Sequence, residues 1–459
     1  MGRLFGTDGA RGIANTEITC ELALQIGHAI AMASQEIYFD QRERPRFLIG
    51  QDTRASSSML ANALAAGLNA VGTDVLMAGV VPTPAVALLV SKWGLQGGAM
   101  VSASHNPCEY NGIKLFGGTG EKLPDALEET IENIILSETC QAPHVIGGGV
   151  GRCAPANGAL QTYTNHLLAS VNPHLAEDLR KQGVLRIALD CANGSACQTQ
   201  PALFQSMGFD CGTIANNPDG TNINTDCGST HMQNLRDFVR RNGYAVGFAF
   251  DGDADRVLAV DETGALADGD KIVAICAKHM ASQGKLRGNT AVVTVMSNMG
   301  FHVFCRKNAI RAEVTAVGDR YVLEAMKANG YNLGGEQSGH IIFSDFAQTG
   351  DGQLTALQLL EVMRQTGKPL SELASEVPIY PQVLVNITVS NLGKLRCDND
   401  PEIQNAAQRA RAELGEDGRV LIRVSGTEPL IRVMLEGQDV AQIARLANEL
   451  AEIVRERLL

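Results

Sequence analysis

The stretch FLIGQDTRASSSMLANALAAGLNAVGTDVLMAG, residues 47–79, contains a short apolar run, a helical stretch rich in Ala and Leu, and a second apolar run. Polar residues end the first run, and Gly-Thr-Asp precedes the second. Strand–helix–strand units of this kind build mainly parallel sheets, because the helix carries the chain back to start a second strand beside the first. The stretch therefore predicts an α/β domain.

The same order occurs twice more along the chain. RIALDCANG (186–194) is followed by QTQPALFQSMG, and AVVTVMSN (291–298) is followed by MGFHVFCRKNAI. Three copies predict three related α/β domains with mixed, mainly parallel sheets. The last part differs, with strand VLVNITV, a helix around 403–414, strands in RVLIRVSG and LIRVMLEG, and a final helix capped by Asp439. That order predicts a smaller C-terminal α+β domain.

Three turn-rich segments divide the chain at the expected joints. Residues 145–159 are rich in Gly and Pro, residues 260–270 are rich in turn formers, and residues 375–382 hold two prolines. We therefore predict domains at 1–155, 156–260, 261–374 and 375–459, arranged around a central cleft. Each domain carries one polar loop that could contribute to chemistry.

Composition limits the classes of partner. The chain has 459 residues, a formal net charge of −12 and no Lys/Arg cluster, so we expect it to bind neither nucleic acid nor an anionic membrane. The longest uncharged apolar stretch, 75–91, is too short to span a bilayer and contains two prolines, and the N-terminus lacks the apolar core of a secretory signal. Eleven cysteines are scattered without a C-x-x-C pair, which favours buried thiols in a cytoplasmic protein over disulfides or a zinc site.

The first polar loop is SASHNP, 102–107, which follows an apolar run and ends at a proline. Small neighbours leave the hydroxyl of Ser104 accessible, His105 adjoins it, and Lys114 follows in NGIK. A serine beside a base is a candidate nucleophile. The alternative is an ordinary polar turn, which is the commoner role of such Ser–His pairs in loops.

The second polar loop is DGDADR, 251–256, after the apolar strand YAVGFAF. Asp251, Asp253 and Asp255 would repel one another, and a hard divalent cation such as Mg²⁺ removes that cost. A solvated acidic turn is one alternative. An EF-hand is another, with Glu262 at its twelfth position, but Arg256 stands where that loop requires Gly and a strand precedes it. We therefore favour a magnesium site.

The third polar loop is GGEQSGH, 334–340. Its glycines allow the backbone to approach a ligand, and Glu336, Ser338 and His340 offer donors and acceptors for sugar hydroxyls. The alternative is a polar glycine turn between two strands.

The fourth polar loop lies in RVSGTEPLIR, 423–432. Guanidinium forks, hydroxyls and a backbone N–H group there would form an anion cradle. A hairpin turn is the alternative. The candidate anion-binding residues are Arg423, Ser425, Gly426, Thr427 and Arg432.

Seven motifs occur in one order: FGTDGARG, GQDTR, PTPAV, ASHNP with NGIK, DGDADR, GGEQSGH and SGTEP. In these motifs the chain resembles the α-D-phosphohexomutase family over essentially its whole length. The resemblance implies an intramolecular phosphotransferase, an isomerase that acts through a phosphoserine at Ser104. It also implies a sugar 1,6-bisphosphate, which is both the intermediate and an activator.

The resemblance further implies residue roles. Asp251, Asp253 and Asp255 would hold Mg²⁺ together with a phosphate oxygen on Ser104. Arg256 would lie beside this metal site and belong to the substrate-binding residues. The remaining roles fall into three groups: Arg11, His105 and Lys114 around the transferred phosphate; Glu336, Ser338 and His340 on the sugar; and Arg423, Ser425, Gly426, Thr427 and Arg432 on the phosphate that is not transferred. Lys114 and His340 are both candidates for the general acid/base.

Finer motifs indicate the substrate. PDGTNINTDCGSTH, VGDRYV and GGEQSGHIIFSD are similar to family members that interconvert glucosamine 6-phosphate and glucosamine 1-phosphate. Tyr110 in EYNGIK is more similar to the branch that acts on mannose and glucose phosphates, which remains the alternative. An aspartyl-type metal-dependent phosphatase and a non-catalytic sugar-phosphate-binding protein are further alternatives, and a homodimer remains open.

Overall fold

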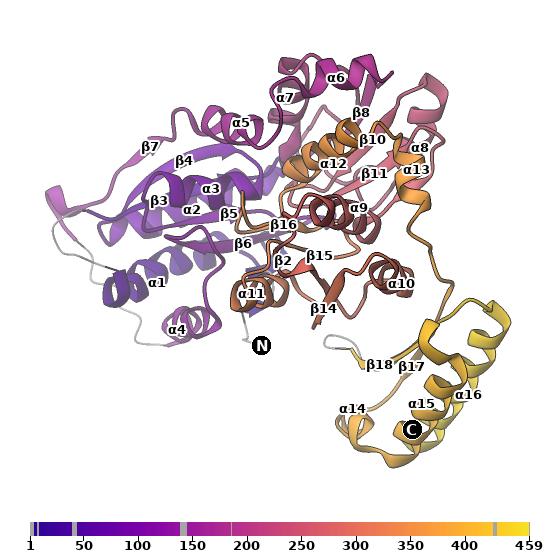
Figure 1. Cartoon of the computed structure of the whole chain (residues 1–459). Helices are drawn as coiled ribbons and strands as arrows, with labels where there is room; N and C mark the ends of the chain where they lie inside the picture. The colour runs from indigo at the N-terminus through magenta and orange to yellow at the C-terminus, as the bar shows by residue number, and fades with distance from the viewer. Residues whose placement is uncertain are drawn as a thin grey trace. The chain divides into compact units, whose positions relative to one another are not determined.

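The computed structural model describes residues 4–6, 9–38, 44–137, 145–184, 186–425 and 429–458. These residues form two compact units. The first contains residues 1–296 and 312–374, and the second contains residues 297–311 and 375–459. Figure 1 shows helices and strands alternating along most of the chain.

The first sheet of the first unit has seven strands in the order β1-β2-β6-β5-β3-β4-β7. Strand β3 pairs in parallel with β4 and β5, whereas β6 runs antiparallel to both β5 and β2. The strands are β1 (Phe5–Gly6), β2 (Gly9–Ile13), β3 (Arg46–Gln51), β4 (Asp74–Val80), β5 (Gly97–Val101), β6 (Tyr110–Gly117) and β7 (Cys153–Pro155). The helices are α1 (Cys20–Tyr38), α2 (Ala55–Ala70), α3 (Thr83–Lys92) and α4 (Asp125–Leu136), with a 3-10 turn, η1 (Gly147–Gly149).

Helices α1 and α2 pack closely because glycines face each other at their contact. A Cβ on Gly27 would lie 2.5 Å from the carbonyl oxygen of Leu64, and one on Gly67 would lie 2.2 Å from that of Leu24. Larger residues there would force the helices apart. This tight layer covers the apolar core of the first sheet.

The second sheet of the first unit has five strands in the order β12-β11-β10-β8-β9. Strand β10 is parallel to β8 and antiparallel to β11, so the loop between β10 and β11 is a hairpin. The strands are β8 (Arg186–Asp190), β9 (Asp210–Ile214), β10 (Val246–Phe250), β11 (Val257–Asp261) and β12 (Leu266–Ala267). The helices are α5 (Ala159–Ala169), α6 (Leu175–Lys181), η2 (Ser195–Gln198), α7 (Gln200–Ser206) and α8 (Gln233–Asn242).

The third sheet has four strands in the order β14-β13-β15-β16. Strand β15 is parallel to β13 and antiparallel to β16, which gives a second polar hairpin. The strands are β13 (Thr290–Thr294), β14 (Arg311–Thr315), β15 (Leu333–Gly335) and β16 (Ile341–Phe343). The helices are α9 (Gly269–Ser282), η3 (Arg287–Asn289), α11 (Asp319–Asn329), α12 (Gly352–Thr366) and α13 (Leu370–Ser375).

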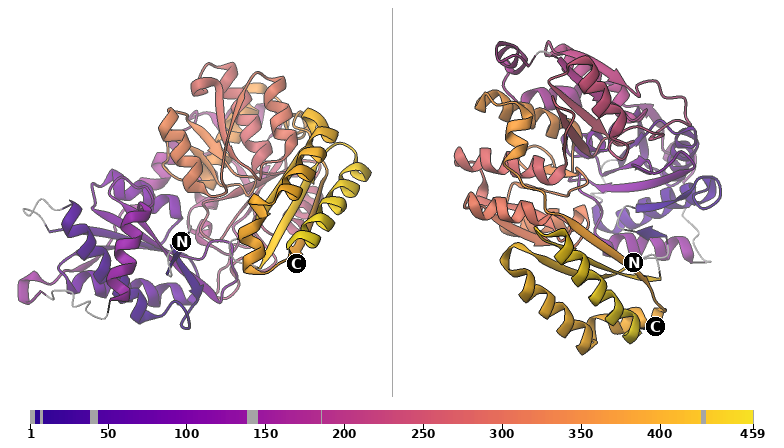
Figure 2. Two further views of the ribbon diagram at one scale, coloured as in Figure 1. Left: turned by 90° about the horizontal axis from the view of Figure 1, so that it is seen from below. Right: turned by 90° about the vertical axis from the view of Figure 1, so that its right-hand side faces the viewer.

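The second unit is built on a three-stranded antiparallel sheet in the order β17-β19-β18. Helices α15 and α16 lie side by side against it, as the yellow helices in Figure 2 show. The predicted cap is confirmed, because Asp439 accepts the N–H group of Ala441 at 2.8 Å. The elements are α10 (Met299–Lys307), β17 (Gln382–Thr388), α14 (Asn391–Arg396), η4 (Cys397–Asn399), α15 (Pro401–Leu414), η5 (Gly415–Asp417), β18 (Arg419–Val424), β19 (Leu430–Glu436) and α16 (Val440–Leu458).

The predicted fold class is confirmed, with mixed α/β sheets and a smaller α+β part at the C-terminal end. Antiparallel strands complete one edge of each of the three mixed sheets. The Gly/Pro-rich segment 145–159 holds β7, so part of it is an edge strand of the first sheet and not a bare linker. The four domain boundaries themselves remain predictions.

The described cysteines are all free thiols, in line with the expectation from their spacing. Five are buried, whereas Cys153 on β7 is exposed. No helix within the described ranges is long and apolar enough to cross a membrane.

Candidate active site

Ser104 lies directly after β5, in a loop that the backbone turns sharply. Its φ is +52°, in the left-handed region that non-glycine residues seldom adopt. The side chain is buried, and its hydroxyl donates to Asp251 Oδ2 at 2.6 Å. The first polar loop is therefore joined to the second, although 147 positions separate the two residues.

The acidic loop between β10 and β11 gathers three buried carboxylates. Ligand oxygens of Asp251, Asp253 and Asp255 all lie within 4.8 Å of one another. Asp253 Oδ1 and Asp255 Oδ1 accept no hydrogen bond from any described residue. Because buried polar atoms without a partner are costly, this set of hard oxygen ligands fits a divalent cation. The three residues could hold a metal ion.

The structure excludes the EF-hand alternative. A strand, β10, leads into the acidic loop where an EF-hand has a helix. Glu262, at the position of the twelfth ligand, bonds to the hydroxyl of Ser371 instead.

Lys114 reaches the acidic loop from β6. Its buried Nζ donates to Asp253 Oδ2 at 2.6 Å and to Asp255 Oδ2 at 3.2 Å. Thr83, at the start of α3, donates its hydroxyl to the same oxygen of Asp253 at 2.6 Å. One ammonium group therefore offsets part of the crowded negative charge.

Charge crowding separates the acidities of two of these carboxyls. Burial raises the pKa of Asp251 well above its usual value, and the charges of Asp255 and Asp253 raise it further. Burial acts the same way on Asp255, but Lys114 and His340 outweigh it and lower the pKa of that carboxyl well below its usual value. Without a cation, the cluster therefore favours a proton on Asp251.

His340 faces the acidic loop from the third polar loop, between β15 and β16. Its Nε2 accepts the backbone N–H group of Gly350 at 3.0 Å, so the ring proton is on Nδ1. Nδ1 lies 3.6 Å from Asp255 Oδ2. Burial lowers the pKa of His340, but the hydrogen bond and charge of Asp255 outweigh it, so the net pKa is raised.

Glu336 is held in the same loop by two local contacts. Its Oε1 accepts the N–H group of Gly318 at 3.1 Å, and Ser338 donates its hydroxyl to Oε2 at 3.3 Å. The predicted turn between strands therefore also fixes the position of the Glu336 carboxylate.

A cavity of about 140 Å³ adjoins these groups. It brings together predicted residues from the first three polar loops. Its lining comprises Ser104, Lys114, Asp255, Arg256, Val317, Gly318, Asp319, Glu336 and His340.

Arginines surround His105 beside Ser104. Its Nδ1 lies 3.2 Å from Arg256 Nη1. Burial and the charges of Arg256 and Arg11 lower the pKa of His105 to about 4. The imidazole is therefore neutral at pH 7, and positive charge near Ser104 comes from the arginines and Lys114.

The fourth polar loop lies in the second unit, on the β18–β19 hairpin. Arg423 and Arg432 are cross-strand neighbours in register. Burial and the charge of Arg432 lower the pKa of Arg423. Ser425 is buried at the end of β18, while the predicted residues Gly426 and Thr427 lie outside the described residues. Two adjacent guanidinium groups favour an anion between them.

Several site residues were missed by sequence reasoning. Thr83 lies in PTPAV and Asp319 in VGDRYV, motifs for which the residues alone gave no role. Asp319 Oδ2 forms an ion pair with Lys122 Nζ at 2.6 Å. Asp319 also lines the cavity. Beneath the Ser104 loop lie Arg54 and Asn224, which bond to its backbone.

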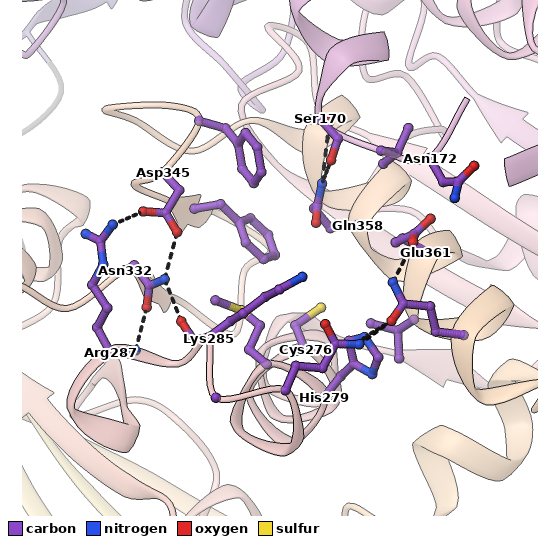
Figure 3. A pocket seen from close by; sticks show the side chains of 18 of the residues that line it. Ser170, Asn172, Cys276, His279, Lys285, Arg287, Asn332, Asp345, Gln358 and Glu361 are labelled. Atoms are coloured by element: carbon purple, nitrogen blue, oxygen red, sulfur yellow. Dashed lines mark hydrogen bonds and ion pairs between the residues drawn. The ribbon is translucent and has the colours of Figure 1, made fainter. Parts of the chain in front are cut away.

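A larger cavity, of about 500 Å³, lies elsewhere in the first unit and is shown in Figure 3. None of the predicted site residues lines it. Arg287 pairs with Asp345 at its rim, and Glu361 pairs with Arg364. Lys285, Arg287 and Asp345 are exposed, and the more buried Glu361 is already paired with Arg364.

Four family models match the chain in succession. They describe phosphoglucomutase/phosphomannomutase, with alpha/beta/alpha domain I at 2–142, domain II at 161–264, domain III at 268–380 and the C-terminal domain at 384–453. The chain belongs to the phosphoglucomutase/phosphomannomutase family. It is therefore an enzyme, an isomerase of the phosphohexomutase kind, and the phosphatase and non-catalytic alternatives fall away.

Relatives within this family align over their whole length. The chain is 50% identical over 459 residues to a phosphoglucosamine mutase of Caldicellulosiruptor bescii, with 100% of both chains covered. It is 48% identical over 457 residues to a phosphoglucosamine mutase of Clostridium novyi, covering 100% of this chain and 99% of that one.

Solved structures share the family fold. A phosphoglucomutase/phosphomannomutase family protein of Burkholderia thailandensis has a TM-score of 0.82 at 22% identity, covering 99% of this chain and 97% of that one. An N-acetylphosphoglucosamine mutase of Aspergillus fumigatus, in complex with GlcNAc-6P and magnesium, has a TM-score of 0.65 at 18% identity, covering 100% and 96%.

Proposed function

We propose that this enzyme is a phosphoglucosamine mutase, which interconverts glucosamine 6-phosphate and glucosamine 1-phosphate through phosphorylated Ser104. One observation carries the proposal: the Ser104 hydroxyl lies 2.6 Å from Asp251 in a buried acidic cluster that adjoins a cavity. The substrate follows from the full-length relatives, which are named for that activity.

The transfer exchanges one P–O bond for another. The bond between phosphorus and Ser104 Oγ breaks as a sugar hydroxyl oxygen bonds to the phosphorus, and the hydroxyl proton passes to a base. The resulting sugar 1,6-bisphosphate turns around and returns its other phosphate to Ser104. Lys114 and His340 are the two candidates for the acid/base group, because both lie at the cavity.

Positive charge around Ser104 stabilises the transferring phosphoryl group. Lys114, Arg256 and Arg11 supply fixed cationic groups, and neutral His105 positions Arg256 through its ring nitrogen. Asp251, Asp253 and Asp255, with a phosphate oxygen on Ser104, would hold Mg²⁺, which supplies further charge neutralisation when bound. The A. fumigatus relative contains magnesium, and this metal prefers oxygen ligands of this kind.

Sugar recognition falls to the third and fourth polar loops. Glu336 offers a carboxylate to the ammonium group of glucosamine, and Ser338 and His340 offer hydrogen bonds to hydroxyls. The phosphate that is not transferred binds the arginine pair and its hairpin. That set comprises Arg423, Ser425, Gly426, Thr427 and Arg432.

We also propose the cellular setting. Free cysteines suit the reducing cytoplasm, where sugar phosphates are found. A sugar 1,6-bisphosphate would activate the enzyme by loading Ser104, since no nucleotide-binding motif is recognised in the sequence to supply the phosphate. Sedimentation would distinguish a monomer from a homodimer.

The proposal is tested with purified protein, Mg²⁺ and a catalytic amount of sugar 1,6-bisphosphate. We expect the highest kcat/KM for glucosamine 6-phosphate, ahead of glucose 1-phosphate and mannose 1-phosphate. A preference for mannose phosphate would overturn the substrate and leave the mutase reaction in place. Turnover of none of the three would overturn the proposed function.

A further inference from the structure

Two backbone carbonyls in the Ser104 loop each accept two hydrogen bonds from side chains. Arg54 Nη2 donates to the carbonyl of Ser104 at 3.0 Å and to that of Asn106 at 2.8 Å. Asn224 Nδ2 donates to the same two carbonyls, at 2.9 and 3.0 Å. Arg54 comes from the start of α2, and Asn224 comes from the polar loop before α8. The two donors therefore hold the Ser104 loop from two sides.

Both donors are themselves fixed by their surroundings. The guanidinium of Arg54 is fully buried and paired with Asp52 at 2.8 Å. Asn224 is buried, its φ is +59°, and its backbone N–H group donates to Ala192 at 2.9 Å. Asparagine is one of the few residues that adopts this left-handed conformation readily. Neither donor can turn away without breaking buried contacts.

The acidic loop closes on the same carbonyl from the other side. A Cβ on Gly252 would lie 2.5 Å from the carbonyl oxygen of Ser104 and 3.0 Å from Asn224 Nδ2. Only a glycine between Asp251 and Asp253 allows this approach. The carbonyl of Ser104 thus sits at the meeting point of the loop, its two donors and the acidic cluster.

We infer that Asn224 is a positioning residue, which fixes the strained backbone of Ser104 so that its hydroxyl faces Asp251. Asn224 lies in the motif PDGTNINTDCGSTH, and it does not line the cavity. Through Asn224, the motif therefore contacts the phosphate-carrying loop. This inference rests on the proposed function, because it takes Ser104 as the residue that carries the phosphate.

The physical reason lies in the left-handed φ of Ser104. Such a conformation costs free energy and persists only where surrounding groups determine it. Anchoring the carbonyl fixes the peptide plane, and the plane fixes the direction of the side chain. Since a displacement of about 1 Å can cost on the order of 10²-fold in rate, losing one anchor should slow transfer without weakening substrate binding.

The first test variant is Asn224→Gly, because glycine keeps the left-handed backbone and removes only the amide. We expect kcat to fall by about ten-fold or more while the KM for glucosamine 6-phosphate changes less than about two-fold. The ratio of kcat/KM for glucosamine phosphate to that for glucose phosphate should stay constant, because Asn224 does not line the cavity.

The second variant is Asn224→Asp, which keeps the size of the side chain and places oxygen against both carbonyls. Its kcat should fall below that of Asn224→Gly, since two acceptors repel each other. Asn224→Asp also tests the inference if Asn224→Gly is unstable. The matched control is Thr53→Val, which removes a 2.6 Å hydrogen bond to Asn193 near the same contact but leaves the Ser104 loop untouched.

A second readout does not depend on turnover. Amide hydrogen exchange in residues 104–106 should be faster in both Asn224 variants than in wild-type enzyme or Thr53→Val. A changed substrate ratio or a raised KM at normal kcat would mean that the loop reads the sugar and would overturn the inference. A wild-type kcat together with wild-type exchange rates in both Asn224 variants would also overturn the inference. Failure of the proposed function is separate, because it would appear in the wild-type enzyme as a different substrate or no turnover.

Discussion

The acidic cluster of the first unit and the arginine pair of the second unit both concentrate like charge, but they are compensated in different ways. The carboxylates are buried, and Lys114 and Ser104 donate hydrogen bonds directly to them. Arg423 and Arg432 are only half-buried, and Arg423 forms no ion pair with any described residue.

This difference follows from the cost of burying charge. A buried carboxylate must be compensated within the fold, so the first site is assembled before substrate arrives. The half-exposed guanidinium of Arg423 is compensated by water, which an incoming phosphate can replace with charge-assisted hydrogen bonds. We therefore expect changes in the acidic cluster to reduce turnover and changes in the arginine pair to weaken binding.

The largest effect should come from Ser104→Ala. Without the hydroxyl no phosphate can be held between turnovers, so kcat should fall by about 10³-fold or more. The matched control is Ser206→Ala on α7, which removes a hydroxyl that donates to the carbonyl of Leu203 at 2.7 Å, away from the Ser104 loop. Mass spectrometry of active enzyme should find the phosphate on Ser104, and a phosphate on an aspartate would contradict this assignment.

The next effect concerns Asp253→Asn, which retains an oxygen for Thr83 and Lys114 but removes a negative charge. Mg²⁺ at about 100 times its dissociation constant should stabilise wild-type enzyme by about 2.7 kcal/mol, and the variant by much less. Turnover should be nearly abolished. Thermal unfolding with and without Mg²⁺ measures the difference, with Asp237→Asn on α8 as control. If Mg²⁺ stabilised Asp253→Asn as much as wild-type enzyme, the metal would have to bind other ligands.

The acidic cluster was predictable from sequence because its signal is local. Three aspartates at alternating positions after an apolar strand are costly wherever the chain folds, so Asp251, Asp253 and Asp255 indicate a cation on their own. The repeated strand–helix–strand order likewise predicted the sheets. Their antiparallel edges include the β5–β6, β10–β11 and β15–β16 hairpins, which the strand–helix–strand order does not contain.

Other residues gave no local signal. Asp319 is the first residue of α11, where an acidic side chain is common because it complements the helix dipole. Asn224 resembles an ordinary turn residue, and Arg54 precedes a helix like many exposed arginines. Their roles depend on chain segments about 50 to 120 positions away folding over them, and sequence patterns do not record such contacts.

A smaller effect is expected for Arg423→Ala. A charge-assisted hydrogen bond is worth about 1.5–3 kcal/mol, so the KM for glucosamine 6-phosphate should rise roughly 10- to 150-fold. Because removing one of two adjacent like charges relieves repulsion, the second unit should not be destabilised. Steady-state kinetics test this against Arg445→Ala, a surface arginine on α16. An unchanged KM would place the phosphate site elsewhere.

The smallest expected effect is on the pH dependence of the stability of the second unit. Burial lowers the pKa of His302 on α10 to about 4, helped by the charges of Arg419 and Arg306. In the unfolded chain the pKa of histidine is about 6.5. Between these values the unfolded chain binds a proton that the folded unit does not, so stability falls as pH decreases from 6.5 towards 4.

Replacing the ring with a neutral side chain should remove this dependence. At pH 5, His302→Gln should have lost about 1 kcal/mol less stability than wild-type enzyme, relative to pH 7, after allowing for the partly exposed ring. The single tryptophan, Trp93, lies in the first unit, so tryptophan fluorescence would not report on the second unit. Hydrogen exchange in α10 and β18 measures the stability of the second unit directly. If both proteins lose protection equally on acidification, neither burial nor the two arginines lowers the pKa of His302 in the folded unit, and the acid sensitivity of the second unit has another source.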